Sequence, residues 1–152
     1  MRTRTTLAGA ALAAAALGTT ASAPESGAQP IPQMPAIGVS ISGLVIPGPA
    51  VVFVHAQPAS STWQTRFSVH TDPAVCAGSA AGMLVKISYV NPGGMRTGGA
   101  TLNPCPNVKV GPQFADLDTN SGQIYTTSVI VGSNYRPNAG QPSLPGFGTF
   151  RR

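Results

Sequence analysis

Residues 62–70, which read TWQTRFSVH, decide the fold class because their side chains alternate between two faces. One face carries the larger and β-branched side chains, namely Trp63, Thr65, Phe67 and Val69. The other face is polar. A period of two with one apolar face is typical of a half-buried β-strand. The segment therefore predicts a strand that places Trp63 and Phe67 in a core.

The same pattern recurs along the chain between clusters of Pro and Gly. Strands are expected in six further segments: 37–46, 50–57, 83–90, 95–102, 108–110 and 123–131. Breakers such as Asn91-Pro92-Gly93-Gly94 separate these segments and exclude long helices. About seven short strands with regular turns predict an all-β fold, a single antiparallel β-sandwich.

In a generic sense, the expected architecture resembles the immunoglobulin-like sandwich. Antibody domains carry a Trp between their two bridged cysteines. Here Trp63 precedes both Cys76 and Cys105. Many unrelated exported proteins share the architecture, so the resemblance implies no functional residues.

The N-terminal segment 1–23 predicts export. Arg2 and Arg4 form a basic start, an Ala/Leu-rich run follows over 7–17, and Ala21-Ser22-Ala23 is a small-residue cleavage site. The apolar run falls short of the roughly 20 residues that a membrane span needs. We expect a cleaved signal peptide and no transmembrane span afterwards; an uncleaved N-terminal anchor is the alternative. The expected location is extracellular or at the cell envelope.

Removing 23 of the 152 residues leaves 129, enough for one domain with its own core. Composition then divides the chain. A Pro-rich extended leader is expected over 24–36, the β-sandwich over 37–138, and an extended Gly/Pro-rich tail over 139–152. Phe147 and Phe150 are candidates to hold that tail against the body.

Cys76 and Cys105 are the two cysteines of the chain. An even count in an exported protein predicts one disulfide. Two free thiols or half of a metal site are the alternatives. A zinc site would require further Cys or His ligands at close spacing, which the sequence lacks.

Charge is sparse, with a formal net charge of +5 spread along the chain. Nucleic-acid-binding proteins gather Lys and Arg on one face, so this scattered distribution argues against nucleic acid as a partner. A modest positive potential suits anionic envelope polymers or lipid head groups. An unknown protein or envelope component is the expected partner.

His55, His70 and Asp72 are the candidates for a hydrolase site with one of the many serines. Pro73 ends the strand near Asp72, however, and no Gly-x-Ser-x-Gly sequence occurs. Acid–base catalysis is built from ionisable side chains, which are scarce here. The sequence therefore favours a non-enzyme without a cofactor, and a small exported hydrolase is the alternative.

Asp116, Asp118 and Asn120 alternate as calcium ligands do. The helix–loop–helix calcium loop has Gly at its sixth position, whereas Gly122 is the seventh residue here. A polar turn between two strands is the expectation, and a calcium-dependent protein is the alternative.

Exposed aromatic and loop residues are the remaining candidates for binding. Tyr125 lies opposite the Ile124 face, and Tyr135 and Arg136 follow the last expected strand. The Gly/Pro-rich loops 91–99 and 134–140 form the expected working surface. The sequence thus predicts a secreted, non-catalytic binding or structural protein. A self-associating envelope subunit is a third hypothesis, because uncharged strands favour edge pairing.

Overall fold

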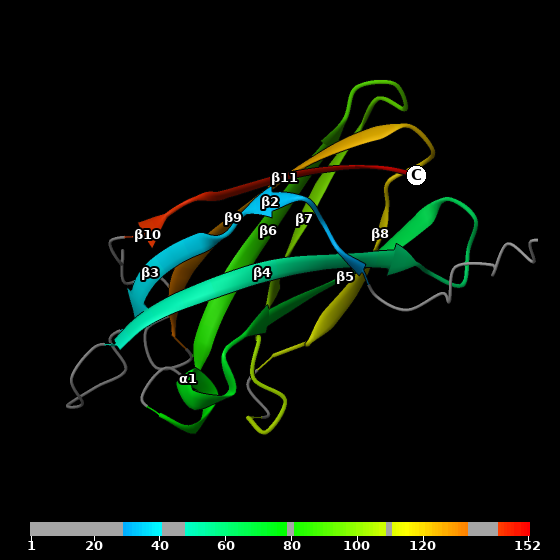
Figure 1. Ribbon diagram of the computed structural model, residues 1–152. Coiled ribbons are helices and arrows are strands. Elements are labelled where there is room, and N and C mark those ends of the chain that lie inside the picture. Colours follow the sequence, from blue (N-terminus) through cyan, green and yellow to red (C-terminus); the bar gives the residue numbers. More distant parts are fainter. Residues whose placement is uncertain (1–28, 41–47, 79–80, 109–110, 134–142) are drawn as a thin grey trace, which may run out of the picture.

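The computed structural model describes residues 29–40, 48–78, 81–108, 111–133 and 143–152. Two antiparallel β-sheets pack face to face (Figure 1) and confirm the predicted β-sandwich. The predicted signal peptide, residues 1–23, lies outside the described residues.

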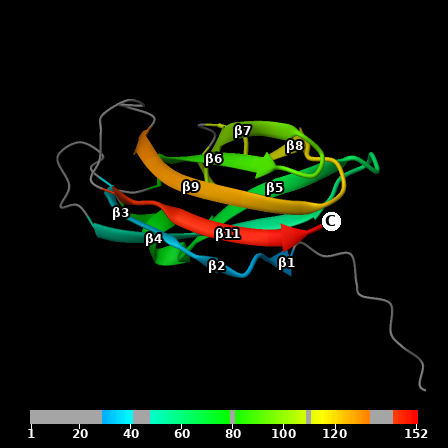
Figure 2. The same ribbon diagram turned by 90° about the horizontal axis from the view of Figure 1, so that it is seen from above.

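The first sheet has the strand order β10 (Ser143–Leu144), β3 (Ala36–Ser40), β4 (Gly48–Pro58), β5 (Gln64–Thr71) and β8 (Phe114–Asp118), and β1 (Gln29–Pro30) also pairs with β4. The second sheet has the order β2 (Gln33–Met34), β11 (Gly146–Arg151), β9 (Gln123–Ser133), β6 (Met83–Asn91) and β7 (Arg96–Leu102). Figure 2 shows the strands of the second sheet side by side.

The core lies between the sheets and follows the predicted alternation. On β5, Phe67 and Val69 are buried, and on β6 the inward residues Met83 to Tyr89 are buried at every second position. The Phe67 ring lies 6.1 Å from that of Tyr89 across the core. Burying a ring of this size stabilises the fold by about 1.5–3 kcal/mol.

Trp63 is the exception, and its predicted place in the core is wrong. Its side chain is 59% exposed. The strand begins at Gln64, so Trp63 belongs to the turn after β4, where the two-residue period no longer directs its side chain.

The described part of the chain contains eleven strand segments instead of about seven. Six of the predicted segments are present as β3, β4, β5, β6, β7 and β9. Val108, from the predicted strand 108–110, lies outside any strand, and residues 109–110 are not described. The longer additions are β8 and β11; the others, β1, β2 and β10, have two residues each.

The predicted leader and tail contribute strands to the sandwich. Residues 29–36 pair first with β4, then with β11, and enter β3. β11 lies between β2 and β9, inside the second sheet. Phe150 on β11 packs edge-on against Phe67, with ring centroids 5.9 Å apart, whereas Phe147 faces outward. The leader and the tail are extended, and pairing with both sheets makes them parts of the body.

A short helix, α1 (Pro73–Ala77), follows β5. Asp72 caps it by accepting a hydrogen bond from the Ala74 N–H, and Pro73 occupies the first turn. Cys76 in this helix forms the predicted disulfide with Cys105, in the segment after β7. The disulfide thereby joins the two connections that cross between the sheets, from β5 to β6 and from β7 to β8.

Candidate functional site

The hydrolase candidates His55 and His70 lie together on the outer face of the first sheet. Their ring centroids are 4.2 Å apart, on the neighbouring strands β4 and β5. Ser68 Oγ is 3.0 Å from His70 Nε2. Partial burial lowers the pKa of His70, which keeps its ring neutral at pH 7. The structure thus contains a Ser–His contact that the sequence did not single out.

Asp72, the third candidate, does not complete this group. Its Oδ1 atom accepts the Ala74 N–H at 2.7 Å as the helix cap. A serine hydrolase holds its His with a carboxylate on the second ring nitrogen. The His70 ring instead lies against a second imidazole, that of His55.

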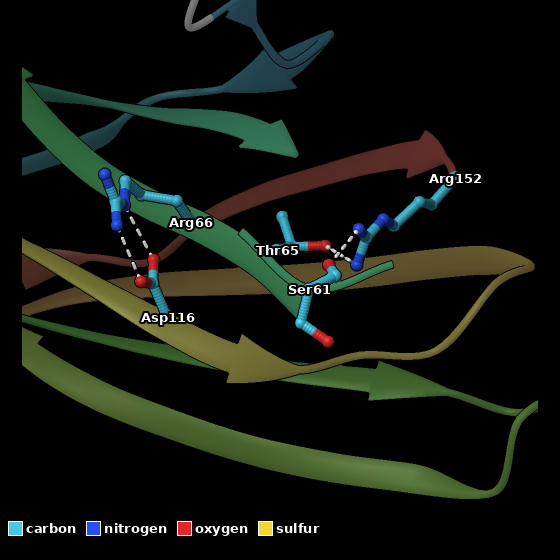
Figure 3. A network of polar contacts seen from close by, with 5 residues as sticks. All are labelled: Ser61, Thr65, Arg66, Asp116 and Arg152. Carbon is cyan, nitrogen blue, oxygen red and sulfur yellow. Dashed lines mark hydrogen bonds and ion pairs between the residues drawn. The ribbon is translucent and has the colours of Figure 1, made fainter. Parts of the chain in front are cut away.

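The calcium candidates are engaged in other contacts. Asp116 lies on β8 and forms a bidentate ion pair with Arg66, with both N–O distances 2.7 Å (Figure 3). That hydrogen bonding lowers the pKa of Asp116. The guanidinium carbon of Arg66 also lies 4.4 Å from the centre of the Phe114 ring. The Asp116 carboxylate is therefore held by a cation of the protein itself.

Asp118 accepts a hydrogen bond from Gln64 Nε2 at 2.8 Å. Asn120 lies beyond the strand, in the turn to β9, with a φ of 56°. Within the part of the chain that the structure describes, no group of three or more His, Cys, Asp or Glu side chains could hold a metal ion. The predicted turn between strands thus comprises residues 119–122, and the two Asp residues precede it on β8.

Three connections gather at one end of the sandwich, which we call the loop end: residues 59–63, 92–95 and 119–122, together with Arg152. They lie toward the right-hand side of Figure 1, away from α1. The predicted working surface 91–99 overlaps this end. No single stretch of sequence contains it, because its parts come from both sheets.

Asn91, at the end of β6, fixes two of these loops. Its side chain is fully buried. Its Nδ2 atom donates to the carbonyl oxygens of Thr119 at 2.6 Å and Ser121 at 3.0 Å, and its Oδ1 atom accepts the Gly94 N–H at 3.0 Å. A carboxamide can satisfy three backbone groups in this way, and buried polar networks of this kind rigidify their surroundings.

Arg152 and Asn120 join the third loop to the others. The backbone of Arg152 exchanges two hydrogen bonds of 3.0 Å with Gly122, and its guanidinium donates to Ser61 O at 3.1 Å and Thr65 Oγ1 at 3.4 Å (Figure 3). The Asn120 N–H donates to Trp63 O at 2.9 Å. Burial lowers the pKa of Arg152, which still carries its charge at neutral pH.

Two large apolar side chains project from these fixed loops. Trp63 is 59% exposed and Met95 is 90% exposed. Met95 has a φ of 46°, a left-handed conformation that is uncommon for a residue with a long side chain. Met95 lies within the predicted working surface 91–99, whereas Trp63 was predicted to lie in the core. In the sequence, the position of both residues beside turn-forming residues was the available indication that they are exposed on loops.

Of the predicted binding residues, Tyr125 is described. It is exposed on the outer face of the second sheet, opposite Val90. Tyr135 and Arg136 lie outside the described residues, as does the loop 134–140.

No protein-family model, curated protein or solved structure matches this chain. Within the described residues, no helix is long and apolar enough to cross a membrane. What the protein does is therefore inferred from the arrangement of its own residues.

Proposed function

We propose that the chain is an exported, non-catalytic binding protein whose working surface is the loop end. One observation carries this proposal: Trp63 and Met95 extend into solvent from loops that backbone hydrogen bonds and the buried Asn91 side chain hold in place. Tryptophan is enriched among the residues that dominate binding energy. Loops that are already ordered lose little conformational entropy on binding.

Export is proposed on the pattern of residues 1–23, and the Cys76–Cys105 disulfide fits an oxidising compartment. The proposed place of action is the medium or the cell envelope. The proposed partner is a protein or another envelope component.

The test uses Trp63, the only tryptophan of the chain, as a fluorescent reporter. The chain from Pro24 onward is mixed with detergent-extracted cell-wall material from the producing cells. We expect sedimentation with this material and a blue shift of Trp63 emission, because binding removes the indole from water. Met95→Ser should weaken sedimentation roughly tenfold or more, as the loss of a buried apolar side chain does.

Phe114→Ser is the matched control, because Phe114 is 52% exposed and begins β8, at the end of that strand far from the loop end. It should bind as the unmodified chain does. Binding without any change in Trp63 emission, or equal losses in Met95→Ser and Phe114→Ser, would contradict the assignment of the loop end. Absence of sedimentation would reject cell-wall material as the partner.

Ester hydrolysis at Ser68 is a second candidate function, favoured by the 3.0 Å contact between Ser68 Oγ and His70 Nε2. A carboxylate on the imidazole is what normally makes such a pair effective. We expect p-nitrophenyl acetate to be hydrolysed equally slowly by the unmodified chain and by Ser68→Ala. A rate that depends on Ser68 would replace the binding proposal with a catalytic one.

A further inference from the structure

Four exposed apolar side chains form a continuous surface on the outer face of the second sheet. We call Met34, Val90, Tyr125 and Phe147 the second-sheet patch; their exposed fractions are 68%, 46%, 53% and 53%. Phe147 lies directly opposite Met34, and Tyr125 directly opposite Val90.

Phe147 also joins the two pairs to each other. It is opposite Thr127, two residues from Tyr125 on β9, which makes Phe147 and Tyr125 diagonal neighbours. The patch thus crosses four adjacent strands, β2, β11, β9 and β6. At about 4.8 Å between strands, its width is roughly 14 Å.

Hydroxyl groups and positive charges surround this patch. The strand register places five hydroxyl side chains on the same face: Ser88, Thr97, Thr101, Thr127 and Thr149. Lys86, two residues before Ser88 on β6, and Arg151, two residues after Thr149 on β11, lie on the same face and are exposed. The described acidic residues, Asp72, Asp116 and Asp118, belong to the α1 cap and to β8. In the described residues, this face therefore carries positive charge only.

These charges argue against a second copy of the chain as the occupant. A symmetric contact between two such faces brings Lys86 and Arg151 close to cations of the other copy, and like charges across an interface cost binding energy. The complementary surface is one that offers negative charge and apolar contact in a single plane. An anionic lipid bilayer has this combination, since phosphates lie directly above the acyl chains.

We propose that the outer face of the second sheet docks on anionic lipid membranes. Met34 and Phe147 enter the boundary between head groups and acyl chains, and Tyr125 lies at head-group level, where amphipathic rings are favoured. Lys86 and Arg151 pair with lipid phosphates. This inference goes beyond the proposed function, because it uses a surface other than the loop end.

The test is flotation with lipid vesicles of two compositions, pure phosphatidylcholine and an equal mixture of phosphatidylcholine and phosphatidylglycerol. The chain from Pro24 onward should float with the mixed vesicles, and added salt should weaken this binding. Phe147→Ser and Met34→Ser should each weaken it roughly tenfold or more. The double variant Lys86→Gln/Arg151→Gln should lose the preference for the anionic vesicles.

Phe114→Ser again serves as the control, because it removes an equally exposed ring from the first sheet. All these side chains are exposed, so circular-dichroism melting curves should show that each variant folds. Equal binding to both vesicle types, no binding to either, or equal losses in Phe114→Ser and Phe147→Ser would overturn the proposal.

Two further measurements separate this proposal from its competitors. Trp63 emission should stay unchanged on vesicle binding; a blue shift would move the lipid contact to the loop end and reject the second-sheet patch. Gel filtration should show a monomer without lipid. A dimer that Phe147→Ser dissociates would make the patch a subunit interface and overturn membrane docking.

Discussion

At the residue scale, Asn91 illustrates what the sequence could and could not predict. Its position in Asn91-Pro92-Gly93-Gly94 correctly indicated the end of a strand and a turn. Its burial could not be predicted, because the Thr119 and Ser121 carbonyls that it binds are 28 and 30 residues away. The exposure of Trp63 could not be predicted either, because it depends on where β5 begins. The strand begins at Gln64, one residue after Trp63.

Replacing Asn91 should destabilise the protein. Asn91→Ala leaves the buried Thr119 carbonyl and the partly buried Ser121 carbonyl without their donor, and we expect the free energy of unfolding to fall by about 1–3 kcal/mol. Urea denaturation measures this loss. Asn107→Ala is the control, because Asn107 is exposed. Equal effects of the two substitutions would show that the Asn91 contacts contribute nothing.

Acid should destabilise the fold through His70. Its pKa is lowered by burial in the folded protein, whereas the unfolded chain binds a proton near the ordinary value of about 6.5. The unfolded state therefore takes up protons first as the pH falls, and stability declines from about pH 7 until the folded pKa is passed. Urea midpoints measured across this range should decline less for His70→Gln. If the urea midpoint of His70→Gln declines with pH as steeply as that of the unmodified chain, the pH dependence of stability comes from other groups.

At the element scale, strands with clear alternation were predicted well, and strands with unusual composition were not. β8 carries Asp116 and Asp118 on its outer face, and this pattern suggested a calcium loop. β11 has Gly146 and Gly148 at inward positions, which a search for apolar alternation cannot recognise. Gly146 is required by close contacts with distant backbone, and the sequence does not reveal these contacts.

Gly146→Ala should strongly destabilise β11. An added Cβ at this position would lie 2.5 Å from the Ala36 nitrogen and 2.8 Å from the Met34 oxygen, so backbone would have to move. We expect a loss of roughly 1–3 kcal/mol, as overpacked sites show. Gly111→Ala is the matched control, since its nearest neighbour would be 3.8 Å away. Thermal unfolding compares them, and similar melting temperatures would contradict this close packing.

The disulfide should contribute strongly to stability. Cys76 and Cys105 are 29 residues apart, and closing a loop of this length stabilises by about 3–4 kcal/mol in the chain-entropy model. We expect the double variant Cys76→Ser/Cys105→Ser to lose about this amount in urea denaturation. Reducing agent should reproduce the loss in the unmodified chain and leave the variant unchanged.

At the scale of the whole molecule, the predicted leader, body and tail are interwoven. The chain passes from β1 in the first sheet to β2 in the second and back to β3, and β10 and β11 make the same crossing. Gln33 links the sheets directly: its backbone pairs with Gly148, while its side chain binds the backbone N–H and C=O of Val54 at 2.9 and 2.8 Å. Composition marked 24–36 and 139–152 as peripheral, because pairing between distant segments leaves no local signal.

Removal of residues 143–152 should therefore abolish cooperative unfolding. The truncation takes β11 from between β2 and β9 and exposes the core around Phe67. A chain that begins at Pro24 should keep its cooperative transition. Calorimetry distinguishes the two, and a sharp transition in the C-terminal truncation would show that β11 is dispensable.

The position of β11 also governs when the protein can fold. Because β11 separates β2 from β9, the second sheet cannot close until residue 151 has left the ribosome. Residues made first therefore wait for residues made last, and no completed sandwich forms on a partly synthesised chain. The export that we propose would require an unfolded chain in the translocation channel, and the late closure of the second sheet fits that requirement.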